Sequence, residues 1–119
     1  MHDHGTIGKI ENTATGNIWS VKDFTITNLN TIGTISNAGM IRSSKDQAIR
    51  NTGSGDTITL IENTTSGATI QAEDDTIYNE NGGIITTIKN AGTIQAWGSS
   101  NAVAINTTEI GRASCRERV

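Results

Sequence analysis

The amino-acid sequence predicts an all-β protein, a parallel β-helix (β-solenoid) of about four coils, each of about 26 residues with three short strands. Two observations lead to this prediction. A short motif recurs four times at almost even spacing along the 119 residues, and the composition favours strands and tight turns over helices. Together they indicate a repeat array rather than a globular domain.

The recurring motif begins with Ile-x-Asn and leads to a glycine and a further isoleucine. Its leading isoleucines, Ile10, Ile35, Ile61 and Ile88, are almost evenly spaced. A second Ile-x-Asn follows each copy at 26–28, 49–51 and 77–79, and it shortens to 105–106 in the last copy. A fixed period of this kind is typical of a solenoid, whose units bury their apolar faces only by stacking on one another.

The composition supports strands because branched side chains replace the usual helix formers. Ile and Thr are the two most frequent residue types, whereas Leu occurs twice and Pro is absent. Branched side chains fit a pleated strand and are restricted in a helix. The 13 glycines and the many asparagines are suited to tight turns between short strands.

Each unit is expected to hold three strands, each centred on one isoleucine. Stacking the units would align these isoleucines into three interior columns of side chains on adjacent strands. The doubled apolar pairs Leu60-Ile61 and Ile84-Ile85 suggest a bend or bulge in the first strand. The predicted columns are Ile10, Ile35, Ile61 and Ile88; Ile18, Ile41, Ile70 and Ile94; and Ile26, Ile49, Ile77 and Ile105.

Asparagines recur in register with the isoleucines and predict two further columns at the outside or the corners of the coils. Asparagine tolerates left-handed backbone, and its amide can bond the equivalent amide one coil away. We interpret both columns as structural ladders; the alternative is an asparagine-lined glycan-binding face. The columns are Asn12, Asn37, Asn63 and Asn90, and Asn28, Asn51, Asn79 and Asn106.

Polar loops follow the second predicted strand of the later units, at 43–47, 73–75 and 97–101. Insertions in successive repeats map to one face of a solenoid. If the chain binds a ligand, this edge is therefore the expected place, with Asp74, Asp75 and Trp97 as the candidate contact residues. The alternative for Trp97 is packing over a corner.

The two ends differ from the repeats. Residues 1–5 are expected to form a ragged N-terminal end, and residues 6–108 the β-helix segment. Residues 109–119 lack the repeat texture, hold the one cysteine, and resemble the translation of a common short-read sequencing adapter. We interpret them as a non-native tail and exclude them from the predicted fold. The remaining residues 1–108 hold six basic and ten acidic groups, a net charge of 6 − 10 = −4.

Charge and hydropathy bound the partners. The chain has a net charge of −3 without a Lys/Arg cluster, which argues against nucleic acid. It has no apolar run of about 18–20 residues, so direct membrane insertion of this segment is not expected. His2 and His4 could share a side of a strand but lack a further ligand nearby, so neither a metal nor another cofactor is predicted.

The recurring I-x-N-x-G-x-I, followed by a polar loop and A-I-x-N, resembles the passenger region of bacterial autotransporters (type V secretion) over residues 6–108. The resemblance implies a right-handed parallel β-helix at the cell surface of a Gram-negative bacterium, exported through an outer-membrane barrel. It also implies an internal fragment whose neighbours are further coils of the same parent chain. Adhesion to a host-surface protein or glycan, or presentation of other domains, is the expected function.

Two other functions compete with adhesion. A polysaccharide-processing β-helix enzyme needs acids held on one strand face, whereas Glu73, Asp74 and Asp75 fall in a predicted loop. No catalytic residues are therefore predicted, and the chain is not expected to be an enzyme. An ice-binding solenoid would need a regular threonine array, but Thr-x-Thr at 25–27 and 57–59 is not repeated in register in the other units.

Overall fold

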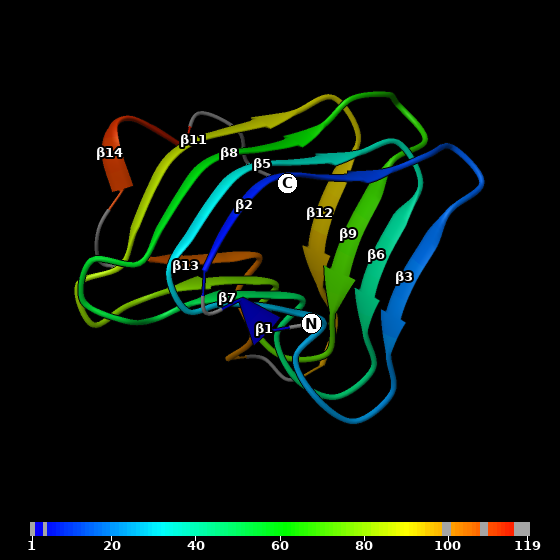
Figure 1. Cartoon of the computed structure of the whole chain (residues 1–119). Helices are drawn as coiled ribbons and strands as arrows, with labels where there is room; N and C mark the ends of the chain where they lie inside the picture. Colours follow the sequence, from blue (N-terminus) through cyan, green and yellow to red (C-terminus); the bar gives the residue numbers. More distant parts are fainter. Residues whose placement is uncertain (1, 4, 99–100, 108–109, 116–119) are drawn as a thin grey trace.

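The computed structural model describes residues 2–3, 5–98, 101–107 and 110–115, with side chains for 5–98 and 101–107. Every regular element in these ranges is a β-strand, and the strands pair in parallel. Figure 1 shows the chain winding around one interior as a stack of roughly triangular coils. Across the described ranges, no helix is long and apolar enough to cross a membrane.

Each of four coils contains a long, a middle and a short strand. The long strands are β2 (Thr6–Asn12), β5 (Thr31–Asn37), β8 (Thr57–Asn63) and β11 (Ile84–Asn90). The middle strands are β3 (Asn17–Ser20), β6 (Met40–Ser43), β9 (Thr69–Ala72) and β12 (Thr93–Ala96). The short strands are β4 (Ile26–Asn28), β7 (Ile49–Asn51), β10 (Ile77–Asn79) and β13 (Ile105–Thr107).

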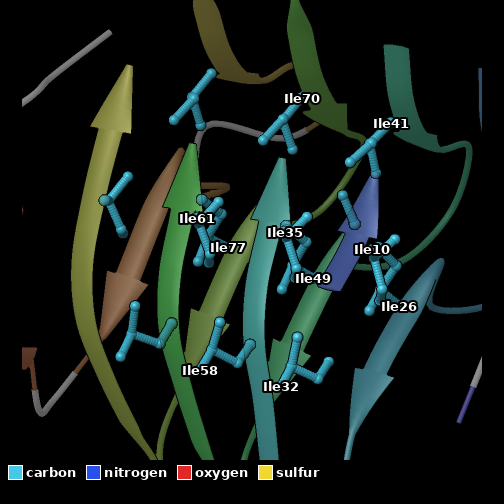
Figure 2. Close-up of a cluster of buried hydrophobic side chains, with 14 of the residues drawn as sticks. Ile10, Ile26, Ile32, Ile35, Ile41, Ile49, Ile58, Ile61, Ile70 and Ile77 are labelled. Carbon is cyan, nitrogen blue, oxygen red and sulfur yellow. The ribbon is translucent and has the colours of Figure 1, made fainter. Parts of the chain in front are cut away.

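Equivalent strands of successive coils pair to form three sheets, here named the long-strand, middle and short-strand sheets. The predicted all-β solenoid with three strands in each coil is thereby confirmed. The register pairs isoleucine with isoleucine in all three predicted columns. Ile18 and Ile105 are partly buried at the margin of the core, and the other ten are buried. Figure 2 shows several of these side chains side by side on neighbouring strands.

A fourth isoleucine column, which was not predicted from the repeat motif, lies in the long-strand sheet. It contains Ile7, Ile32, Ile58 and Ile85, paired in register. A flat strand would place residues three positions apart, such as Ile58 and Ile61, on opposite faces. The long strands bend between them, where Thr59 has no partner in the register, so both isoleucines point inward. The bend also leaves Ile84 39% exposed and buries Ile85.

The first asparagine column is a buried hydrogen-bonded ladder at the corner between the long-strand and middle sheets. Asn12 Nδ2 donates to Asn37 Oδ1 at 2.8 Å, Asn37 Nδ2 to Asn63 Oδ1 at 2.9 Å, and Asn63 Nδ2 to Asn90 Oδ1 at 2.8 Å. Asn37 and Asn63 are at most 1% exposed. The alternative of a glycan-binding face is wrong, because these amides point into the coil and their hydrogen bonds are taken up there.

The second asparagine column differs from the prediction at its last member. Asn28 donates to Asn51 and Asn51 to Asn79, each at 2.7 Å, but Asn79 Nδ2 then donates to Thr107 Oγ1 at 2.8 Å. The register pairs Asn106 with Tyr78, so Asn106 lies outside the ladder. The sequence motif is one residue shorter at 105–106, so aligning it with the earlier copies matched Asn106 with Asn79. The strands pair without that gap, and Thr107 lies opposite Asn79 instead.

Both ends extend the stack beyond the predicted segment. Strand β1 (His2–Asp3) pairs with β4, and β14 (Ile110–Cys115) pairs with β11. The register of β14 is irregular, because the step from Ile85 to Thr87 on β11 matches the step from Ile110 to Ser114. The edge of a parallel sheet offers backbone donors and acceptors to any extended chain, so pairing does not require the repeat pattern. The non-native origin of residues 109–119 stays a prediction.

Candidate functional site

The predicted polar loops lie at one corner of the solenoid. Residues 21–25, 44–48 and 73–76, and in the fourth coil the described residues 97–98 and 101–104, join the middle sheet to the short-strand sheet, so topology stacks them on one another. Backbone hydrogen bonds link them: Thr25 N donates to Gln47 O at 3.3 Å, Ala48 N to Thr76 O at 3.0 Å, and Thr76 N to Val103 O at 3.1 Å. We name this region, with the adjoining outer face of the middle sheet, the loop corner.

The three predicted contact residues differ in their surroundings. Trp97 is 42% exposed, and Asp74 is also exposed. Asp75, in contrast, is only 7% exposed; its carboxylate accepts from Val103 N at 2.7 Å and from Asn106 Nδ2 at 2.6 Å. Asp75 therefore ties Val103 and Asn106 of the fourth coil to the third coil. The Asp75 carboxylate is thus engaged within the solenoid, and its role as a ligand contact stays a prediction.

Acidic side chains gather at the loop corner and affect one another. Burial raises the pKa of Asp46 above its ordinary 3.8, and the carboxylates of Asp74 and Asp23 add to the rise. Arg50 and Lys45 oppose it. The charged form of Asp46 is therefore less favourable in the folded solenoid than in the unfolded chain. At neutral pH this carboxylate lowers the free energy of unfolding.

Substitution of Asp46 by Asn is expected to raise the urea midpoint of unfolding at pH 7. Because folding raises the pKa of Asp46, the loss of stability caused by its charge is fully present at neutral pH. The penalty fades as the pH falls through the folded-state pKa, and it is absent near about pH 3, where both states are largely protonated. The gain should therefore shrink between pH 7 and pH 3. Asp23→Asn, which removes one repulsive neighbour, should act in the same direction but less strongly; an Asp46→Asn gain equal at both pH values would contradict the electrostatic cause.

Both tryptophans of the chain converge on one arginine at the loop corner. The Arg42 guanidinium carbon lies 5.4 Å from the ring centre of Trp19 and 5.1 Å from that of Trp97. Trp19 is 52% exposed, and its Nε1 donates to Ser44 Oγ at 2.8 Å. Cation–π contacts of this kind hold both indoles in place while leaving much of their surface in solvent.

Trp97 was predicted from the sequence as a contact residue, whereas Trp19 and Arg42 were not. The register places Trp19 directly beside Arg42, although the two belong to different coils. Trp97 then reaches the same guanidinium from the fourth coil. The pair of Trp19 and Arg42 could have been predicted by aligning the outward-facing positions of successive coils. The second contact depends on side-chain direction, which the spacing does not give.

A shallow depression adjoins this cluster. It has a volume of about 370 Å³ and is lined by Lys45, Glu73, Asp74 and Gly98. Gly98 approaches the coil below closely, because its N donates to Glu73 O at 2.8 Å and a Cβ there would lie 2.1 Å from that oxygen. A side chain at this position would collide with the Glu73 backbone, so glycine permits the close approach of the two coils beside Trp97.

Other candidate features give no comparable cluster. A second depression of about 290 Å³ lies at another corner around Gly16, Gly39 and Met40, and none of its lining residues is charged or aromatic. Thr25 and Thr27 are buried, so that pair adds nothing to an exposed threonine array. Over the described side chains, no group of three or more His, Cys, Asp or Glu is placed to hold a metal ion. The side chains of His2 and His4 lie outside that part.

Comparison with protein-family models, characterised proteins and solved structures finds no match to this chain. The class is defined by the fold itself: the chain is a parallel β-solenoid repeat protein, with an aromatic and charged corner on an otherwise polar exterior.

Proposed function

We propose that this chain is a structural, adhesin-type segment of a surface-displayed autotransporter passenger, exposed outside a Gram-negative cell. In this role the coils stack on neighbouring coils of the same parent chain, and the loop corner contacts a host surface. The repeat motif and the cysteine-free coils are consistent with export as an extended solenoid. The observation that carries the adhesive part is the pair of exposed tryptophans.

Tryptophan is the residue most enriched at binding hot spots. Aromatic residues make up 3% of this chain, and both of its tryptophans are exposed at the same corner. Val21, 59% exposed, and Val103, 45% exposed, lie in loops of the same corner, so four of the five large exposed apolar side chains in the described ranges gather there. A solenoid serving only as a spacer has no use for such a cluster, whereas an adhesive surface does.

An attachment assay tests this function. Fluorescent beads coated with the purified chain are expected to attach to cultured mammalian epithelial cells above the level of uncoated beads. Trp19→Ala combined with Trp97→Ala should reduce attachment to that background, because the aromatic contact area is lost. Tyr78→Phe, on the short-strand sheet, is the control and should attach normally. Attachment that is absent, or equal in the double variant, would contradict adhesion through this corner.

Surface display is tested separately with the complete parent gene. Antibodies against residues 6–108 should label intact cells of a Gram-negative host that expresses it. Labelling only after lysis would contradict surface exposure.

A further inference from the structure

The chemistry of the loop corner narrows the kind of ligand that it can hold. Trp19 and Trp97 each have one side near Arg42 and remain 52% and 42% exposed. Indole faces present flat apolar area, with a polar N–H at the edge. A ligand that alternates apolar C–H faces with polar groups, as a pyranose ring does, matches such surfaces better than a wholly apolar one.

Charge at the loop corner is mixed, with an excess of carboxylates. Glu73 and Asp74 line the depression together with Lys45. The whole corner holds three cations, Lys22, Arg42 and Lys45, and five carboxylates, Asp23, Asp46, Glu73, Asp74 and Asp75. An anionic ligand would face two carboxylates, and like charges brought together are costly. Hydroxyl groups, in contrast, can donate to the carboxylates and accept from the cations.

Hydrogen-bonding groups continue along the middle sheet beside the aromatic residues. Gln71 and Gln95 follow Trp19 and Arg42 in the same outward row, and Gln95 Nε2 donates to Gln71 Oε1 at 2.8 Å. This bond fixes the two amides and leaves further donors and acceptors on them. Within the described residues, the salt bridge that is present joins Lys9 to Glu11 on β2, in a different sheet from Arg42. Among these residues, no carboxylate forms a salt bridge with the Arg42 guanidinium.

We propose that the loop corner binds a neutral pyranose oligosaccharide. The sugar rings stack on Trp19 and Trp97, and their hydroxyls bond the charged groups around the 370 Å³ depression and the glutamine row. Arg42 acts as a positioning residue, because it lies between the two indoles and sets their separation. The inference deepens the proposed adhesive function and rests on it for its biological meaning.

Intrinsic fluorescence provides a direct test, because the chain contains two tryptophans and both belong to the proposed site. The purified chain is titrated with three neutral probes, namely cellohexaose, maltohexaose and mannohexaose, and with an acidic one, hexagalacturonic acid. We expect a saturable emission change with at least one neutral probe and a weaker or absent change with the acid. Trp97→Ala, monitored through Trp19, should weaken the affinity by about tenfold or more.

Arg42→Gln has a matched control in this chain. Arg50 also stacks on one aromatic ring, with its guanidinium carbon 4.5 Å from the ring centre of Phe24, but it lies on the short-strand sheet. Arg42→Gln should weaken binding of the neutral probe and shift the emission maximum of the unliganded chain, since both indoles lose their neighbour. Arg50→Gln should do neither. Equal effects of the two substitutions would overturn the positioning role.

The remaining outcomes separate the ligand from the function. The absence of saturable binding by any neutral probe, or a preference for hexagalacturonic acid, overturns the inference. If bead attachment depends on the tryptophans but survives both excess neutral oligosaccharide and enzymatic removal of surface glycans, adhesion stands and the glycan inference fails. If oligosaccharide binds but the beads do not attach, the glycan inference stands and the adhesive function fails.

Discussion

Ile61→Asp is expected to unfold the stack or to destabilise it by roughly 4 kcal/mol or more, because it places a carboxyl group in the apolar interior. Ile61 is fully buried, and it pairs in register with Ile35 and Ile88. A charge there has no partner and no route to water. Far-UV circular dichroism during urea unfolding measures the loss as a fall in the midpoint or the absence of a transition.

Two controls separate the charge from the mere change of residue. Ile61→Val retains a branched apolar side chain and should cost about 0.5–1.5 kcal/mol. Asp74→Ala, at the exposed loop corner, should stay within about 0.5 kcal/mol. If Ile61→Asp and Asp74→Ala had equal effects, the assignment of Ile61 to an interior column would be refuted.

Asn37→Ala is expected to cost about 3 kcal/mol or more, because the lost amide serves several buried groups. Its Oδ1 accepts from Asn12 Nδ2 and Gly39 N, and its Nδ2 donates to Asn63 Oδ1, Gly39 O and Thr69 O. Alanine satisfies none of these partners, and each one left unpaired away from water costs about 1–3 kcal/mol. The same urea titration measures the loss.

The ladders themselves supply graded controls for Asn37→Ala. Asn90 lies at the partly exposed end of the same column, so water can replace the bonds lost in Asn90→Ala, and about 1 kcal/mol is expected. Asn37→Thr should fall between the two, because Thr107 already accepts from Asn79 Nδ2 at the equivalent place in the second ladder. If Asn37→Ala and Asn90→Ala proved equally mild, the buried ladder would contribute no special stability.

The isoleucine columns were predictable because they repeat. The even spacing of the motif aligns equivalent positions, and parallel pairing with like neighbours then follows from stacking alone. The fourth column and the true end of the second ladder were missed for one reason. Both depend on local backbone geometry: the bend that turns Ile58 and Ile61 inward together, and the spacing that puts Thr107, not Asn106, opposite Asn79.

The candidate site was predictable only in part. The sequence placed the polar loops at one edge and identified Trp97 and Asp74, because insertions between fixed strands must share a corner. It grouped Asp75 with them, although the folded loop turns that carboxylate toward Val103 and Asn106. Trp19 and Arg42 belong to regular strands and carry no loop signal, so only their register revealed them.

The sequence by itself therefore determined the architecture of this protein, because a repeated apolar pattern leaves the same face to be buried in every coil. The tertiary structure alone decided which side chains meet across coils: the amide ladders at the corners, and Arg42 between Trp19 and Trp97. The physical reason is that burial follows a periodic rule readable along the chain. Contacts between particular side chains depend instead on bends, register and side-chain direction, which exist only once the coils have stacked.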